Sequence, residues 1–414
     1  MPAHQQKITN VGLFVSSVDG YLYNERMNTD AFTAAPATGI VHVTSDSQLA
    51  PALDRLAQGR YLAIDTEFLR ESTYYAKLCL VQLGNEHACV VVDVLALSSL
   101  KPLLEFILDR SRIKVLHAAR QDLEVLVQAQ NNGMAPDMGL TPQVPGPLFD
   151  TQIAAGLLGL PGQIGYGDLL AKRLHVNLTK GLARTDWSRR PLSDEQLQYA
   201  ADDVRYLGPL FQQLQSGLQA RGRDGWLQQE TGSLENLALY RTRPEDAWLR
   251  LKGTAQLQPA QRAVLKQLAE WREARAIQAD RPRGWILSDE ALRNMSERLP
   301  TTLEDLGRIR DLQPAVLKRN GQALLELIAN ALQNADSEAP ARDFRPTTQQ
   351  QSQVSKLMQL VRNTAERLEI SPELLATRRD AEQLVYFDKY DELLLGWRKD
   401  VIGDALLAAH RASL

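Results

Sequence analysis

Hydrophobic and polar positions follow two different periods along the chain. From Val41 to about Gly225, short apolar runs such as "YLAIDTE", "KLCLVQLG", "ACVVVDV" and "IKVLHA" predict strands. They alternate with helical patterns, among them "SLKPLLEFILDR" and a helix that begins near Gln121. This order predicts a three-layer α/β domain, with an antiparallel component among the early strands.

After about Trp226 the strand signals disappear, and the pattern is helical as far as Leu414. It is interrupted at "NADSEAPARDFRPTTQQQSQ", a polar segment that predicts a linker. We therefore expect a poorly ordered extension (1–40), an α/β domain (41–225), a connector (226–255), an all-α module (256–335), a linker (336–353) and a second all-α module (354–414).

Composition narrows the class of protein. The 414 residues are 44% hydrophobic and 23% charged, which predicts a soluble protein of two or more domains. No apolar run approaches the ~20 residues that a membrane span needs, and the N-terminus has no secretory signal pattern, so we expect a cytoplasmic protein with no membrane partner. The net charge of -3 gives no general attraction to nucleic acid, so such binding must come from local patches.

Two carboxylates stand in the first long predicted strand. Asp65 and Glu67 are two residues apart in "YLAIDTE", so their side chains project to the same face. Like charges held together there need a compensating cation. An acid that merely closes a strand is the alternative reading of each residue taken alone.

Further acidic residues occur at two later points. Asp122 and Glu124 lie in the first turns of the helix that follows "IKVLHA", where acids also stabilise the helix dipole. Another helix begins in "PLSDEQLQYAADDVRYL", and its residues Tyr199 and Asp203 are four apart and share one face, whereas Asp202 points elsewhere. Taken alone, such a pair is more often a surface feature than a site.

Together and in this order, the three segments resemble the exonuclease motifs of the DEDD superfamily. Within that superfamily the chain resembles bacterial ribonuclease D in particular, through the segments "DTEFLRESTYY", "LFDTQ", "RTDWSRRPLS" and "YAADDVRYL". The resemblance implies a ribonuclease H-like fold with a mixed sheet. Tyr199 stands four residues before Asp203, as in the Tyr subgroup; the His subgroup would have its histidine at Gln198.

The resemblance also implies a reaction, the hydrolytic removal of 3'-terminal nucleotides from RNA with release of 5'-mononucleotides. A phosphodiester is already negative, so its attack by water needs cations, and two Mg²⁺ or Mn²⁺ ions suit the carboxylates of the set Asp65, Glu67, Asp122 and Asp203. The phenol of Tyr199, with an ordinary pKa of about 10, is a poor base at neutral pH. We expect it to orient the attacking water.

A basic segment beside this predicted site is a candidate for RNA binding. It runs from Lys172 to Arg190 and contains one acidic residue, Asp186, among these candidates for phosphate contact: Lys172, Arg173, Lys180, Arg184, Arg189 and Arg190. A solvated surface is the alternative. Trp187 and the pair Tyr74 and Tyr75 are suited to stacking on bases, although packing explains them equally well.

The helical half resembles another known module. Residues 256–335 are similar to the HRDC domain, which occurs in RecQ helicases and ribonuclease D. "SPELLATRRDAEQLV" in the second module echoes "LSDEALRNMSERL" in the first, which indicates a second, degenerate copy. Basic and acidic residues balance from Gln256 to the end, so strong nonspecific RNA binding by these modules is not implied.

The sequence therefore predicts a 3'-5' exoribonuclease of the ribonuclease D type, whose substrates by resemblance are precursor tRNAs and other small structured RNAs with 3' trailers. One alternative is a DNA-directed 3'-5' exonuclease, against which the absence of a polymerase or helicase region argues. Another is a noncatalytic RNA-binding scaffold. An unused cluster of acids would be costly to keep in a packed site, which argues against the scaffold.

Overall fold

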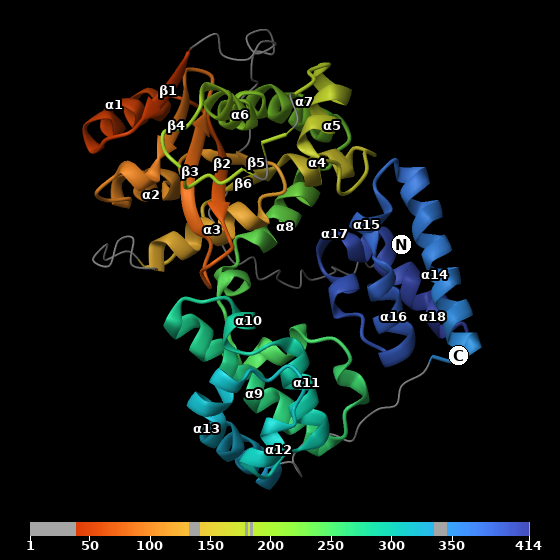
Figure 1. Cartoon of the computed structure of the whole chain (residues 1–414). Coiled ribbons are helices and arrows are strands. Elements are labelled where there is room, and N and C mark those ends of the chain that lie inside the picture. The colour runs from red at the N-terminus through yellow and green to blue at the C-terminus, as the bar shows by residue number, and fades with distance from the viewer. Residues whose placement is uncertain (1–38, 132–140, 179–180, 183–184, 335–345, 414) are drawn as a thin grey trace, which may run out of the picture.

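The computed structural model describes residues 39–131, 141–178, 181–182, 185–334 and 346–413 (Figure 1). The expected N-terminal extension lies outside the described residues except at its last positions. Three bodies are visible in Figure 1: an α/β domain, a helical module below it that begins with α9, and a C-terminal module that begins with α14.

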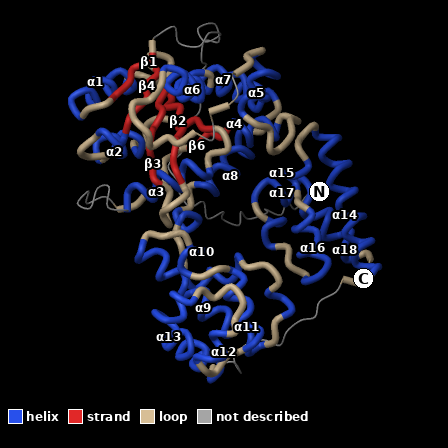
Figure 2. Tube along the Cα trace, viewed as in Figure 1, coloured by secondary structure: helices blue, strands red, loops and turns tan. Residues whose placement is uncertain are grey.

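A six-stranded sheet forms the centre of the first domain (Figure 2). Its order is β1-β4-β3-β2-β5-β6, with bounds β1 (Ile40–Val43), β2 (Tyr61–Leu69), β3 (Lys77–Gly84), β4 (Cys89–Asp93), β5 (Ile113–Leu116) and β6 (Leu148–Asp150). β3 pairs antiparallel with β2 and β4, and the other pairs are parallel. The predicted mixed sheet with antiparallel early strands is confirmed.

Helices cover both faces of this sheet. Alternate residues of β2 divide between two cores, because successive side chains of a strand point to opposite faces. Leu62 and Ile64 pack with α1 (Asp46–Ala57), α2 (Lys101–Leu108) and α3 (Arg120–Asn131). Tyr61 and Ala63 pack with α4 (Thr151–Leu157), α5 (Tyr166–Leu174), α6 (Asp194–Arg205) and α7 (Leu207–Ala220). The three predicted layers are confirmed.

The connector and the first helical module follow α8 (Asp224–Leu234). The connector contains the short 3-10 helices η3 (Leu237–Tyr240), η4 (Pro244–Arg250) and η5 (Thr254–Gln256). The module consists of α9 (Pro259–Ala279), α10 (Arg283–Ile286), α11 (Asp289–Arg298), α12 (Leu303–Gly307) and α13 (Pro314–Gln333). Its buried residues, together with some from η4, form a core separate from both cores of the α/β domain.

The second module begins six residues earlier than its expected start at 354, because the hydroxyl of Thr347 caps the first turn and Gln350 completes the capping box. Its elements are α14 (Thr348–Leu368), α15 (Pro372–Leu375), α16 (Arg378–Phe387), η7 (Asp391–Leu394), α17 (Gly396–Arg398), the π-helical turn η8 (Lys399–Gly403) and α18 (Asp404–Arg411).

This second module shares a core with the α/β domain. Its buried apolar residues belong to the same cluster as those of α4 to α7. At the junction the rings of Trp226 and Trp397 stack, with centroids 4.4 Å apart and planes at 12°. Figure 1 shows α15 and α17 next to α4 and α8. The two parts are therefore packed as one apolar body, which the sequence pattern does not indicate.

Candidate active site

The two carboxylates of β2 face the α6 side of the sheet. Asp65 and Glu67 continue the alternation of Tyr61 and Ala63, whose side chains pack against α6. Asp203 reaches them from α6, and oxygen atoms from the three carboxylates lie within 4.8 Å of one another. The structure thus joins one segment of the sheet to a helix 136 to 138 positions later in the chain.

Helix α6 presents two residues to the site. Ser193 and Gln196 form a capping box, which starts the helix at Asp194. Ala200, Ala201 and Val204 of this helix are buried against the sheet, which leaves Tyr199 and Asp203, one turn apart, at the edge of a cavity.

The cavity has a volume of about 220 Å³. It is lined by residues from five places in the chain: Asp65, Glu67, His117, Tyr166, Tyr199, Asp203 and Leu207. Four of these come from the predicted set, and they supply three carboxylates and one phenol. His117, Tyr166 and Leu207 complete the wall.

Asp122 is not one of the three carboxylates that cluster within 4.8 Å, although its charge acts on Asp65. It lies in the first turn of α3, is buried, and does not line the cavity. Its carboxylate accepts a 2.6 Å hydrogen bond from the hydroxyl of Thr66, which projects to the α3 face of β2. The hydrogen bond from Thr66 fixes the orientation of this carboxylate, and its role as a fourth metal ligand stays a prediction.

Burial and mutual repulsion raise the pKa values of all these acids. Burial, then Asp203 and Asp122, raise the pKa of Glu67 to about 9. Burial, then Asp202 and Asp122, raise the pKa of Asp203 to about 7. Burial raises the pKa of Asp65 well above its usual range, and the neighbouring Asp122 and Asp203 add to the effect. Such a cluster favours any cation that can enter it.

The donor set fits a hard divalent cation. The clustered ligands are all carboxylate oxygens, which Mg²⁺ and Mn²⁺ prefer, and no sulfur ligand lines the cavity. No lysine or arginine of the described chain lines the cavity to neutralise the acids. A metal ion is therefore the counter-charge that this arrangement can accept.

Tyr199 is poorly suited to act as a base. Burial, followed by the charges of Asp203 and Glu67, raises the pKa of its phenol far above the ordinary value of 10. The hydroxyl therefore keeps its proton at neutral pH and can donate a hydrogen bond. The role of Tyr199 in orienting the attacking water stays a prediction.

The sequence gives little or no indication that His117 and Tyr166 line the cavity. His117 is a strand-end residue, and its ring atoms are engaged: Nδ1 lies 2.9 Å from Oγ1 of Thr151 and Nε2 lies 3.0 Å from the carbonyl oxygen of Ile164. Tyr166 donates its hydroxyl proton to the carbonyl oxygen of Asp202 at 3.1 Å. Both side chains therefore support the wall, and only long-range packing reveals Tyr166.

The other acids considered from the sequence have partners outside the cavity. Glu124 pairs with Arg70 at 3.4 Å and accepts a hydrogen bond from Gln128. Asp202 pairs with Arg205 at 2.9 Å, as expected for a residue that points away from Asp203. Neither lines the cavity.

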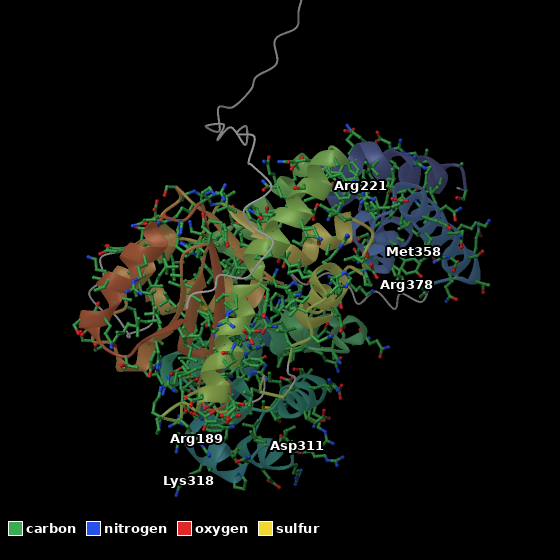
Figure 3. All side chains as sticks on the ribbon, turned by 90° about the horizontal axis from the view of Figure 1, so that it is seen from above. Arg189, Arg221, Asp311, Lys318, Met358 and Arg378 are labelled. Carbon is green, nitrogen blue, oxygen red and sulfur yellow. The ribbon has the colours of Figure 1, made fainter. Side chains whose placement is uncertain are left out.

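The basic residues of the segment from Lys172 to Arg190 differ in exposure and in ion pairing. Lys172 and Arg189 are exposed, and Arg173 is half-buried. Arg189 pairs with Asp186 at 3.1 Å, and Figure 3 shows it on a different part of the surface from Arg221. Lys180 and Arg184 lie outside the described residues. Arg190 pairs with Asp93, and its guanidinium nitrogens all donate to protein acceptors, so we remove it from the RNA-binding set.

The aromatic candidates for base stacking are used in packing. Trp187 is only 1% exposed. Tyr74 donates its hydroxyl proton to the buried Glu273 of α9, and the backbone N–H of Tyr74 donates to Asp280 at 3.0 Å. Tyr75 stands beside Tyr74 with ring centroids 4.8 Å apart. The tyrosine pair therefore attaches the α/β domain to the first helical module.

No helix in the described part of the chain combines the length and apolar character needed to cross a membrane.

Comparison with known proteins agrees with the site. Residues 40–219 match the family model described as 3'-5' exonuclease, and residues 261–328 match the HRDC domain. Ribonuclease D of Sphingobium indicum is 38% identical over 369 residues, covering 87% of this chain and 92% of that protein. Ribonuclease D of Nitrobacter hamburgensis is 36% identical over 377 residues, covering 90% and 95%.

A solved structure shows the same architecture. The crystal structure of Escherichia coli RNase D, described as an exoribonuclease involved in structured RNA processing, superposes with a TM-score of 0.79 at 29% identity. The match covers 91% of this chain and 99% of that chain, so it includes the helical modules as well as the α/β domain.

Proposed function

Because the chain belongs to the ribonuclease D family of 3'-5' exoribonucleases, we propose that it removes 3'-terminal nucleotides from RNA at the cavity between β2 and α6, with two divalent metal ions. The observation that carries this proposal is the convergence of Asp65, Glu67 and Asp203 within 4.8 Å beside the hydroxyl-bearing Tyr199. We propose Asp122 as the fourth ligand.

The metal ions would neutralise charge on the phosphate, activate the attacking water and stabilise the leaving oxygen. The carboxylates of this chain would hold these ions, and the hydrogen bond from Thr66 orients Asp122. The phenol of Tyr199 donates a hydrogen bond that fixes the water for attack on phosphorus. The P–O bond to the 3'-oxygen of the preceding nucleotide breaks, that oxygen takes a proton, and a nucleoside 5'-monophosphate is released.

We propose precursor tRNAs and other small structured RNAs with 3' trailers as substrates, and therefore a cytoplasmic site of action. The 220 Å³ cavity is too small for a folded RNA, so a single-stranded 3' end must enter it. Exposed Lys172 and Arg189, with Arg173, are the described candidates for contacting the phosphates upstream of that end.

The test uses purified full-length protein with Mg²⁺ or Mn²⁺ on three substrates: 3'-extended tRNA, single-stranded RNA and single-stranded DNA of equal length. We expect stepwise shortening of both RNAs from the 3' end, with trimming of the tRNA ending near its folded body. Equal or faster degradation of DNA would support the DNA-directed alternative. RNA binding without any metal-dependent cleavage would support the noncatalytic scaffold.

A further inference from the structure

Arg190 lies in the turn that leads into α6, and it makes a bidentate ion pair with Asp93. Its Nη2 donates to Oδ1 of Asp93 at 2.7 Å, and its Nε donates to Oδ2 of the same carboxylate. Asp93 is the last residue of β4, and its side chain is 5% exposed. The ion pair therefore attaches the turn to the end of a buried strand.

The remaining donors of Arg190 bind backbone carbonyl groups. Nη1 donates to the carbonyl oxygens of Trp187 and Arg189, each at 2.7 Å. Nη2 also donates to the carbonyl oxygen of Cys79 in β3 at 3.2 Å. One guanidinium group thus connects β3, β4 and the turn, a geometry that a planar fork of donors can satisfy and a lysine cannot.

The turn held by Arg190 is in contact with Tyr199. Trp187 is buried, and its ring centroid lies 6.0 Å from that of Tyr199 with the planes tilted by 33°. The indole N–H of Trp187 has no hydrogen-bond partner among the described residues, so Trp187 acts on its neighbours through its shape. Ser193, which caps α6, follows three residues after Arg190.

From these contacts we propose that Arg190 is a positioning residue for Tyr199, acting through the Trp187 ring and the start of α6. The inference rests on the water-orienting role given to Tyr199 in the proposed function. Arg190 itself has no free donor for RNA. Loss of its contacts lets the indole and the first turn of α6 shift, and a displacement of about 1 Å at a reacting group can cost ~10²-fold in rate.

A double-mutant cycle tests the proposal with Arg190→Gln, Tyr199→Phe and the combined variant. We expect Arg190→Gln to lower kcat by about 10- to 100-fold with little change in KM for RNA or in metal affinity. In the Tyr199→Phe background, Arg190→Gln should lower kcat by less than about 3-fold, because both substitutions remove the same interaction. The proposal would be overturned if the loss of kcat in the combined variant equalled the product of the two single losses. A rise in KM at unchanged kcat in Arg190→Gln would overturn it as well.

Arg112→Gln is the matched control for general loss of stability. Arg112 is buried, pairs with Asp109 at 2.7 Å, and directly precedes β5, at the opposite end of that strand from His117. Its replacement should lower the thermal midpoint and leave kcat unchanged at temperatures well below that midpoint. If Arg190→Gln does not fold, the cycle is run with Arg190→Lys, which keeps the charge and should give a smaller loss of kcat that is again absent in Tyr199→Phe.

The outcomes separate this inference from the proposed function. A Tyr199→Phe enzyme with the wild-type rate would overturn the role of Tyr199 in the reaction. A slow Tyr199→Phe enzyme combined with wild-type kcat in both Arg190 variants would overturn the positioning role alone.

Discussion

The hydroxyl of Thr66 donates a 2.6 Å hydrogen bond to the carboxylate of Asp122, and this bond crosses from β2 to α3. Thr66 stands between the two clustered acids of β2 and points to the opposite face of the sheet. The same three-residue stretch therefore presents two carboxylates to the cavity and orients a third from behind.

Removing this hydrogen bond should weaken metal binding. In Thr66→Val the shape is nearly kept, but Asp122 loses the contact that lowers its pKa, now about 6, and that fixes its orientation. We expect affinity for Mn²⁺ to fall by about 10- to 100-fold, as for other partners of metal ligands. Titration calorimetry measures it. Thr66→Ser retains the hydroxyl and should bind nearly as well as wild type; equal weakening in both variants would contradict this role for the hydrogen bond.

The raised pKa values predict how pH affects the metal-free protein. Glu67 and Asp203 have ordinary pKa values of 4.5 and 3.8, and in the folded protein these rise to about 9 and about 7. Between these two sets of pKa values the folded state binds more protons than the unfolded state. The stability that these protons contribute is complete near pH 4, and it is lost as the pH rises from about 4 to about 9. The thermal midpoint of metal-free protein should fall over that range.

Mg²⁺ should reduce that fall, because the cation replaces the lost protons. Asp203→Asn should reduce it as well, since one of the repelling charges is gone. Thermal scans at pH 5, 7 and 9 with and without Mg²⁺ check both statements. A metal-free midpoint that is flat, or that rises with pH, would contradict the assignment of these acids to one strongly repelling cluster.

The junction between the α/β domain and the second helical module should be important for stability. Trp397 is 5% exposed, stacks on Trp226 and donates its indole proton to Glu230 at 2.7 Å. Trp397→Ala should lower the free energy of unfolding by ~3–5 kcal/mol, as measured by urea denaturation. Trp285 is 60% exposed, so Trp285→Ala should change it by ~0.5 kcal/mol or less.

This junction also changes an expectation drawn from the sequence. The strands and every candidate ligand precede residue 225, which suggests that a chain ending near Arg243 would fold and degrade short RNA. The shared core predicts instead that such a chain exposes the apolar surfaces of α4 and α8 and loses stability. The first module, which has a separate core, is the better candidate for a part that selects substrates.

Two exposed basic residues, Lys172 of α5 and Arg189 of the turn into α6, should contribute to RNA affinity. Lys172→Ala and Arg189→Ala should each raise KM and reduce by ~1 the slope of log affinity against log salt, with kcat unchanged. Arg378→Ala is the control, because Arg378 lies on the second module, far from Arg189 in Figure 3. Binding titrations between 50 and 200 mM salt, about the range over which phosphate contacts weaken, give the slope. An unchanged slope in both variants would remove these residues from the RNA path.

Local sequence patterns are enough to predict some parts of the fold and the site. The period of two in "YLAIDTE" places Asp65 and Glu67 on one face, and the capping box sets the start of α6. Arg190 shows the limit of such patterns, because its partner Asp93 is 97 positions away and a sequence does not show which arginines have their donors bound within the protein. Tyr166 and the apolar junction at Trp397 likewise depend on packing between distant segments.

We expect Asp203 and its neighbouring carboxylates to catalyse metal-dependent exonucleolytic cleavage. The most direct measurement follows a 5'-labelled RNA with Mg²⁺ in wild type, Asp203→Asn and the matched control Asp202→Asn, whose residue pairs with Arg205 outside the cavity. We predict one-nucleotide steps from the 3' end in wild type and Asp202→Asn, and no turnover in a folded Asp203→Asn protein. Cleavage by Asp203→Asn at the wild-type rate would contradict the assignment of Asp203 to the catalytic site.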